Sequence, residues 1–476
     1  MAKHPGIHIF ESTKLSLASN GMSGLRPLLV GRFYKHDGTA YNLADGILEI
    51  DDWLSFSDIC LTSSLFIFVD KNGNPIQLNS HNNATVVTEK IAHRTRSKNH
   101  RRKFRQAQFK EEEGVKFNNG VLALRHYFDN GGGPCLLLSY EEKEKLNITE
   151  VLQEYDEISL MATIDADTDE HEKEINTELD KAISKNKQAF LVTCHANIET
   201  PKPVYGTNRI QTATYGPKLI TGYGYSLDDT GILVNLEDNT QKSEPGTETK
   251  FVSLAQLRNE SDKADICKKI KKVLEKINLP AKAKEPVILS PCAAVVGAYC
   301  RTERQFGIWK APANVALIGA MPEKLVTEKE HGELNENGIN AIIWDKKYGS
   351  LIMGARTLED PNKTAWLYVP VRLLFNTVER DLRTMMAPVI FEPNSLATWQ
   401  IVRNGIESYL YNLWKKGGLY GTSPEQAYAV NIGPETMNED DINNGVLRAR
   451  IGLAALRPAE FIYLEFTQDV QNIMSA

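Results

Sequence analysis

The spacing of hydrophobic residues between positions 394 and 416 predicts one long amphipathic helix. Asn394 follows a proline, and its side chain can cap the free N–H groups of the first turn. Gly417 comes directly after Lys415 and Lys416, an order typical of a helix C-terminus. The helix must pack its apolar face on a neighbouring surface; the residues of that face are Leu396, Trp399, Val402, Ile406, Leu410 and Leu413.

Two strands are expected after this helix, at residues 427–432 and 446–453, with a polar turn at residues 433–444 between them. In the second strand, apolar residues alternate with Arg448 and Arg450, which predicts a half-buried strand. Residues 459–470 are expected to form a further strand, which would be apolar on both faces over its first half. Such a strand needs neighbours on both sides, and no later segment of this sequence can pair with it.

Strands and helices alternate over residues 148–194, which predicts an α/β arrangement around a parallel sheet. Residues 40–92 are expected to be rich in short strands, and residues 281–286 are expected to link two domains. The elements expected before residue 200 are strands at Arg26–Gly31, Leu65–Val69, Cys135–Ser139, Ile158–Thr163 and Ala189–Cys194, and helices at Leu122–Phe128, Ile148–Glu154 and His171–Lys185.

The chain has 476 residues, which exceeds one compact core and predicts two or three domains. Its net charge of −6 is too small to indicate a strongly electrostatic partner. The sequence shows neither a signal peptide nor an apolar run long enough to span a membrane. The cysteines lack metal-ligand spacing and favour a reducing compartment, so we expect folding in a cytoplasm; they are Cys60, Cys135, Cys194, Cys267, Cys292 and Cys300.

Three local patterns suggest chemistry but fit structural roles better. Asp165–Glu170 resembles a calcium loop, yet its sixth position is Glu170 and its twelfth is Asn176, where that loop needs glycine and glutamate. Gly131–Gly133 follows a helix and is expected to end it, because a phosphate loop lies between a strand and a helix. Cys292 and Cys300 have no histidine nearby in sequence, so buried structural thiols are expected.

A basic run between Arg94 and Arg105 is the densest cluster of positive charge in the sequence. It is consistent with nucleic-acid binding, but Glu111–Glu113 follow closely and no aromatic residues are interleaved, so a solvated loop explains it better. Three classes therefore remain: a structural assembly protein, an α/β hydrolase-like enzyme and a nucleic-acid-binding protein. The enzyme class lacks a nucleophile elbow, metal-ligand spacing and a phosphate loop in this sequence.

Several short blocks, taken in order, resemble the contractile tail sheath family of phages, R-type bacteriocins and phage-like contractile injection systems. The match is densest over residues 286–476 and looser over residues 35–280. The blocks are Gly6–Glu11, Asn130–Gly132, Trp309–Asn314, Gly338–Asn340, Gly354–Thr357, Phe391–Asn394 and Arg457–Phe461.

The resemblance implies a structural subunit, not an enzyme, that needs no cofactor. Such subunits polymerise helically, as hexameric rings, around an inner tube and contract to drive the tube through a target envelope. The implied fold is mixed α/β, with a terminal arm at residues 1–24, an outward-facing middle region at 25–285, a sheath core at 286–458 and a linking strand at 459–476. Implied partners are further copies of the chain, the inner tube protein, baseplate and terminator proteins, and sister sheath proteins; membrane and nucleic acid are not expected.

The resemblance also assigns roles to residues. The linking arms would contain Ile7, Ile9, Phe10 and Glu11 at one end and Phe461, Ile462, Tyr463, Leu464 and Phe466 at the other. Trp309–Asn314 and Gly354–Leu358 would belong to the core that receives the arms. Two surfaces are candidates for tube contact, one with Arg403, Lys415 and Lys416 and one with Glu435, Glu439 and Asp440. Assembly is expected in a bacterial cytoplasm, and the subunit then becomes part of the contractile particle.

Overall fold

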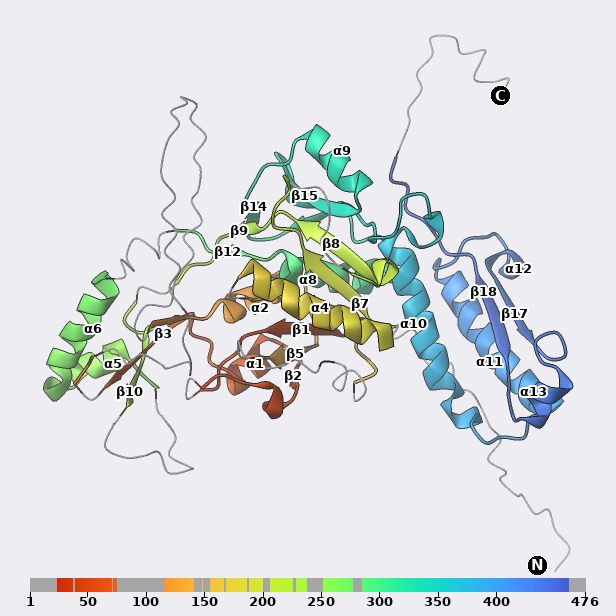
Figure 1. Cartoon of the computed structure of the whole chain (residues 1–476), viewed down its shortest axis with the longest axis horizontal. Coiled ribbons are helices and arrows are strands. Elements are labelled where there is room, and N and C mark those ends of the chain that lie inside the picture. The colour runs from red at the N-terminus through yellow and green to blue at the C-terminus, as the bar shows by residue number, and fades with distance from the viewer. Residues whose placement is uncertain are drawn as a thin grey trace, which may run out of the picture.

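The computed structural model describes residues 24–461, apart from 37–38, 71, 75–114, 141–147, 149–154, 167, 186–187, 200–205, 226–227, 238–250 and 277–284. A nine-stranded sheet forms its central body, in the order β13-β16-β15-β8-β7-β6-β1-β5-β2 (Figure 1). The strands are β1 (Pro27–Gly31), β2 (Leu48–Ile50), β5 (Cys135–Ser139), β6 (Leu160–Thr163), β7 (Phe190–Cys194), β8 (Thr212–Gly216), β13 (Val315–Leu317), β15 (Ile339–Asp345) and β16 (Gly349–Met353).

The middle of this sheet is parallel, as the alternating sequence pattern predicts. Strands β15, β8, β7, β6, β1 and β5 pair in parallel, whereas β2, β16 and β13 join the two edges antiparallel. Successive residues of β1 face opposite layers: Leu28 and Val30 pack with helix α4 (Asp169–Lys185), and Leu29 packs with α2 (Asn119–Asp129) and α8 (Cys292–Phe306). The central strands are therefore apolar on both faces because helices cover both.

Small residues allow α2 and α8 to pack very closely. A Cβ atom added at Gly297 would lie 2.4 Å from the carbonyl oxygen of Tyr127, a separation that a real Cβ atom cannot adopt. Cys292 and Cys300 are fully buried on the same helix, which confirms the expectation of buried thiols. Burial raises the pKa of the Cys300 thiol to about 11, so it remains protonated at neutral pH.

A second lobe extends from the body beside α5 and α6, at the left of Figure 1. Its sheet has the order β11-β10-β3-β4, and a separate three-stranded sheet has the order β12-β9-β14. The strands of these two sheets are β3 (Leu65–Asp70), β4 (Val115–Phe117), β9 (Leu219–Thr221), β10 (Leu233–Glu237), β11 (Phe251–Ser253), β12 (Ile288–Leu289) and β14 (Ala320–Pro322). The helices of the lobe are α5 (Leu254–Asn259) and α6 (Ala264–Lys276), whereas α1 (Trp53–Ile59) and α9 (Glu328–Glu336) lie with the central body.

Residues 369–455 form a third part, which we call the C-terminal lobe (right of Figure 1). Helix α10 runs outward from the body, α11 runs beside it, and strands β17 and β18 form a two-stranded sheet that packs on α11. The elements are α10 (Val369–Met386), α11 (Leu396–Lys415), α12 (Pro424–Ala427), β17 (Tyr428–Ile432), α13 (Glu439–Asn443) and β18 (Ala449–Leu453).

The structure corrects the predicted start of the long helix. Ser395, not Asn394, is the N-cap of α11, and its side chain accepts the Thr398 N–H. The Asn394 side chain instead accepts the indole N–H of Trp399 at 2.6 Å and donates to the Val446 carbonyl at 3.2 Å. Asn394 was a plausible cap from sequence, but these contacts from later residues occupy its side chain.

The other end of α11 is as predicted. Gly417 has a φ of 82°, and the N–H groups of Gly417 and Gly418 donate to carbonyls of the last turn. The predicted apolar face is buried from Trp399 to Leu413, whereas Leu396 is exposed. The polar segment at 433–444, expected to be a turn, contains the short helix α13.

The boundary expected at residues 281–286 does not separate two folded bodies. Residues 339–341 of β15 pair in parallel with residues 214–216 of β8, so one sheet contains strands from both sides of that boundary. Pairing between distant segments overrides the local linker signal at 281–286. The outward orientation expected for residues 25–285 stays a prediction.

Several sequence predictions lie outside the described residues. These are the linking residues Ile7, Ile9, Phe10, Glu11, Ile462, Tyr463, Leu464 and Phe466, and the basic run at 94–105. Among the described helices, none is long and apolar enough to cross a membrane. Within the described ranges, no group of three or more His, Cys, Asp or Glu side chains has a metal-binding arrangement.

Candidate functional site

The two-stranded sheet of the C-terminal lobe leaves strand edges open to further pairing. Strands β17 and β18 pair antiparallel from Tyr428 opposite Leu453 to Ile432 opposite Ala449. Within the described part of the chain, each of the two strands has the other as its single partner. An open edge of this kind presents unpaired N–H and C=O groups that an added strand can use.

A groove of about 780 Å³ lies between α10, α11 and β18. Its walls are mainly apolar, with Leu382 and Met386 from α10, Val402 and Ile406 from α11, and Ile451 from β18. Charged residues such as Glu379 and Arg383 also line it. The groove therefore combines an apolar floor with a neighbouring strand edge, an arrangement that suits an extended apolar segment.

The loop before α11 exposes two large apolar side chains beside this groove. Ile390 is 65% exposed and Phe391 is fully exposed, and both residues line the groove. Phe391 also has a φ of 72°, a left-handed conformation that is costly for an aromatic residue. Exposed apolar residues beside an apolar groove indicate an interaction surface, not an ordinary solvent face.

The two lysines of one candidate tube-contact surface and the acidic residues of the other lie at opposite ends of α11. Lys415 and Lys416 are exposed at its C-terminal end, whereas Glu435, Glu439 and Asp440 are exposed near its N-terminal end. A helix of 20 residues separates these ends by about 30 Å. They are therefore two distinct surfaces.

Arg403 differs from the other candidates for tube contact. Its guanidinium donates to the Ile432 carbonyl at 2.6 Å and so helps to hold β17 on α11. This contact gives Arg403 a role within its own lobe.

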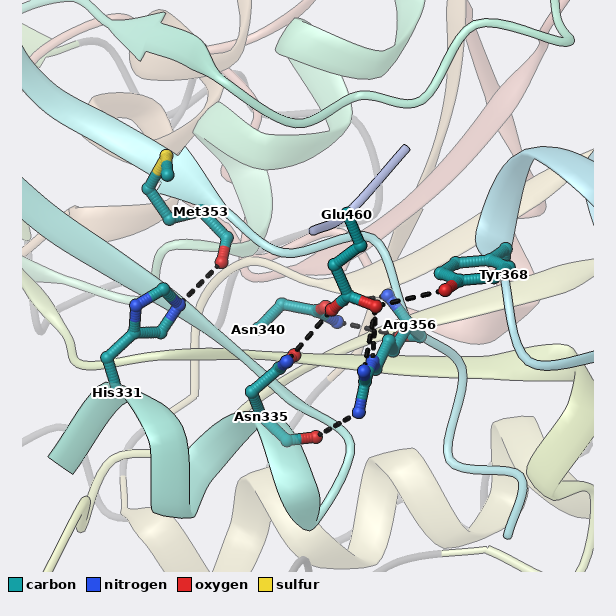
Figure 2. A network of polar contacts seen from close by, with 7 residues as sticks. All are labelled: His331, Asn335, Asn340, Met353, Arg356, Tyr368 and Glu460. Carbon is teal, nitrogen blue, oxygen red and sulfur yellow. Dashed lines mark hydrogen bonds and ion pairs between the residues drawn. The ribbon is translucent and has the colours of Figure 1, made fainter. Parts of the chain in front are cut away.

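A polar network surrounds Glu460, where the chain returns from the C-terminal lobe to the body (Figure 2). One carboxylate oxygen accepts from Arg356 Nη2 at 2.7 Å, from Arg356 Nε at 3.1 Å and from the Tyr368 hydroxyl at 3.0 Å. The other oxygen accepts from Asn335 Nδ2 at 2.8 Å. Every oxygen of the Glu460 carboxylate is therefore hydrogen-bonded.

These contacts set the protonation of the groups involved. Burial alone raises the pKa of Glu460, but hydrogen bonds from Arg356 and Asn335 outweigh it and the net pKa lies below the ordinary value. Burial and the neighbouring carboxylate raise the pKa of Tyr368. At neutral pH the network therefore contains a charged carboxylate, a guanidinium and a neutral phenol that donates.

The backbone of Arg356 is fixed to the central sheet by a buried asparagine. Asn340 on β15 accepts the Arg356 N–H and donates to the Arg356 carbonyl, each at 2.8 Å, and donates to the Thr214 carbonyl on β8 at 3.1 Å. Gly354 leaves room for this contact, because a Cβ atom there would lie 2.6 Å from Asn340 Oδ1. Three of the sequence blocks, at 338–340, 354–357 and 457–461, therefore meet in one place.

The predicted receiving core divides between two places. Gly354–Leu358 contains Arg356, which contacts Glu460 of the same chain. Trp309 lies beside the turn after α11, since a Cβ atom at Gly418 would be 2.8 Å from its ring. Sequence reasoning missed Asn335 and Tyr368, which no local pattern marks.

Charged residues also gather at the carboxyl ends of the parallel strands, where α/β enzymes bind ligands. Here Arg32 pairs with Asp165 at 3.0 Å and Lys218 pairs with Asp169 at 2.7 Å. Burial raises the pKa of Glu172 to about 7 beside these pairs. The ion pairs link the strand ends to one another and to the start of α4. They are therefore assigned a structural role.

Comparison with known proteins gives matches to contractile sheaths. The model of the phage tail sheath C-terminal domain matches residues 362–469, which include the whole C-terminal lobe and Glu460. No curated protein sequence matches the chain.

Solved structures match over nearly the full length. The helical sheath of the anti-feeding prophage in its contracted state is 27% identical, with 98% of this chain and 100% of that chain covered and a TM-score of 0.65. A chain of the sixfold-symmetrised baseplate of the same prophage is 28% identical, with 99% and 100% covered and a TM-score of 0.62. The contracted sheath complex of the extracellular contractile injection system PVC is 27% identical, with 99% of both chains covered and a TM-score of 0.61. The sheath model matches the C-terminal lobe and two contractile sheaths match nearly the whole length, which confirms the resemblance of this chain to the contractile tail sheath family.

Proposed function

We propose that this chain is a structural subunit of a contractile sheath, and that neighbouring subunits are joined by strand addition at the C-terminal lobe. The observation that carries the second statement is the open β17–β18 sheet beside an apolar groove. A segment added along β18 would gain main-chain hydrogen bonds from the strand edge and bury alternate side chains in the groove. The sequences at residues 7–11 and 461–466 supply apolar residues suited to that role.

Association with other components of a particle follows from the same proposal. The similar chains are described in a helical sheath and in a sixfold baseplate, which supports self-assembly in sixfold rings and contact with a baseplate. An inner tube, a terminator and sister sheath proteins are further proposed partners. We place assembly in a bacterial cytoplasm, before the subunit becomes part of the contractile particle.

The linking role is tested by truncation. Chains that lack residues 1–23 or residues 462–476 are expected to fold, as judged by circular dichroism, but to form no tubes or rings in negative-stain electron microscopy. The full-length chain is the positive control. Normal polymerisation of both truncated chains would contradict the linking role.

The groove is tested by one residue on each face of β18. Ile451 lines the groove, and the exposed Arg450 is its neighbour in sequence, with a side chain on the opposite face of the strand. Ile451→Glu is expected to stop polymerisation, because it places a charge where an apolar segment would dock. Arg450→Gln serves as the matched control and is expected to polymerise. Equal assembly by both variants would place the docking surface elsewhere.

Tube contact is proposed on the C-terminal lobe, and its two candidate surfaces can be separated. One variant carries Lys415→Glu and Lys416→Glu, and the other carries Glu439→Gln and Asp440→Asn. The variant that still forms sheath-like polymers but no longer co-sediments with the tube identifies the contact surface. Tube binding by both variants at the parental level would exclude both surfaces.

A further inference from the structure

The base of the C-terminal lobe is closed by contacts between the two segments that connect it to the body. Tyr368 directly precedes α10, where the chain enters the lobe, and Glu460 follows the lobe where the chain leaves it. The Tyr368 hydroxyl donates to the Glu460 carboxylate at 3.0 Å, although the two residues are 92 positions apart. This hydrogen bond therefore holds the segment that enters the lobe beside the segment that leaves it.

The same carboxylate is fastened to the body from two further elements. Arg356 lies in the loop after β16, and Asn335 is the next-to-last residue of α9. The Arg356 guanidinium also donates to the Asn335 carbonyl at 3.0 Å, so the two partners of Glu460 hold one another (Figure 2). The Glu460 side chain therefore binds three segments at once: the end of α9, the loop after β16 and the residue before α10.

Burial makes this contact costly to break. The side chains of Arg356 and Glu460 are only 10% and 19% exposed, whereas those of Lys329 and Glu333 on α9 are 88% and 53% exposed. An exposed pair contributes little, because water solvates each charge when the pair separates. Removing one partner of a buried pair leaves the other charge without compensation, which is strongly unfavourable.

The chain leaves this contact abruptly. Ala454 and Ala455 still pair with the lobe, through the Ala454 N–H to the Ala427 carbonyl at 2.8 Å and a bridge between Leu419 and Ala455. Glu460 is held by the body, and the next residue, Phe461, is 62% exposed. Ala459 is exposed as well, so Glu460 is a held residue between two exposed neighbours.

We propose that Arg356 and Glu460 form a clamp that fixes the root of the C-terminal linking arm, so that the arm bends after residue 460 when subunits move. This inference rests on the proposed linking role of the arm. Arg356 and Glu460 act as positioning residues, since they direct the arm and do not form the intersubunit contact.

The clamp determines which contacts bear a force that is applied to the linking arm. With the clamp closed, force on residue 461 passes through Arg356 and Asn340 into the central sheet. With the clamp open, the same force acts on residues 456–459 and then separates β18 from β17, because Ala455 and Ala454 are the next contacts back along the chain. A linked lattice therefore needs the clamp to keep the two-stranded sheet intact during movement.

The test uses the full-length chain with Glu460→Gln, and Glu333→Gln as the matched control from an exposed pair. Hydrogen exchange is measured on the unassembled subunit, and the length of sheaths after shear is measured by negative-stain microscopy. Glu460→Gln is expected to speed amide exchange at residues 454–460 by about tenfold or more, as loss of a buried charged contact implies. Exchange in β8 and β15 is expected to stay at the parental level, and sheaths are expected to break into shorter pieces. The control is expected to match the parent in both measurements.

Two results would overturn the clamp. One is exchange at residues 454–460 within about twofold of the parent, and the other is equally faster exchange in the central sheet, which would make Glu460 a general stability residue. Arg356→Lys keeps the charge but loses the forked contact, so a partial effect is expected and parental exchange would also count against the clamp. A chain lacking residues 462–476 retains the clamp, so its normal assembly would instead refute the linking role of the C-terminal arm.

Discussion

Gly354→Ala is the substitution whose effect follows most directly from the geometry around Asn340. A Cβ atom at position 354 would lie 2.6 Å from Asn340 Oδ1 and 2.9 Å from Asn340 Cα. The first atom is held by the Arg356 N–H, and the second belongs to the backbone of β15. Movement of the first atom would break the hydrogen bond to Arg356, and movement of the second would displace β15.

The magnitude has two parts. Overpacking of a close contact costs about 1 to 3 kcal/mol, and a buried hydrogen bond that loses its partner costs about 1 to 3 kcal/mol. Gly354→Ala is therefore expected to lower the free energy of unfolding by about 2 to 6 kcal/mol. It is also expected to loosen Arg356, because Asn340 fixes the backbone of that residue.

The measurement is urea denaturation, at a concentration where the parental chain sediments as a monomer. Gly332→Ala is the matched control, because Gly332 lies within α9 and a Cβ atom there would contact nothing within 4 Å. The control is expected to stabilise the chain by about 0.5 to 1 kcal/mol, since alanine restricts the unfolded chain more than glycine does. If both alanine variants gave the same midpoint, the account of the Asn340 contact would be wrong.

Three further predictions concern the clamp, the lobe and the thiols. The folded protein lowers the pKa of Glu460, so its carboxylate stabilises the clamp above the ordinary pKa of 4.5, and this contribution is lost as pH falls through the lowered value. Exchange at residues 454–460, divided by the intrinsic exchange rate at each pH, should then rise. Ile406→Ala is expected to destabilise the chain by about 2 to 5 kcal/mol in urea denaturation, whereas Leu396→Ala, at a site 68% exposed, should change stability by less than about 0.5 kcal/mol. All six cysteines are free and buried, and Ellman's reagent should label none in the native chain and six in urea; rapid native labelling would contradict their burial.

Elements with a strong local period were predictable from the sequence. The helix predicted at His171–Lys185 corresponds to α4, and the strands predicted on either side of it correspond to β6 and β7. Helix α4 repeats its apolar residues at helical spacing, and the two strands are short continuous apolar runs, so both patterns can be recognised without distant contacts. The buried face of α11 was predictable for the same reason.

Features that depend on distant pairing were not predictable. The pairing of β8 with β15 joins residues 214 and 339, and no composition change marks it. Arg356 and Glu460 both lie in sequence blocks typical of the family, yet they are 104 positions apart and only the fold brings them together. Asn394 shows the same effect on a smaller scale, because Trp399 and Val446 bind the side chain that the local pattern assigns to the cap.

The order of strands in the central sheet has a consequence for synthesis on the ribosome. Strand β8 is made by residue 216, but its outer neighbour β15 is complete only at residue 345. Until then a growing chain presents the edge of a buried parallel strand to its surroundings, a state prone to aggregation. A nascent chain of this protein therefore depends on shielding of that edge over more than a hundred codons.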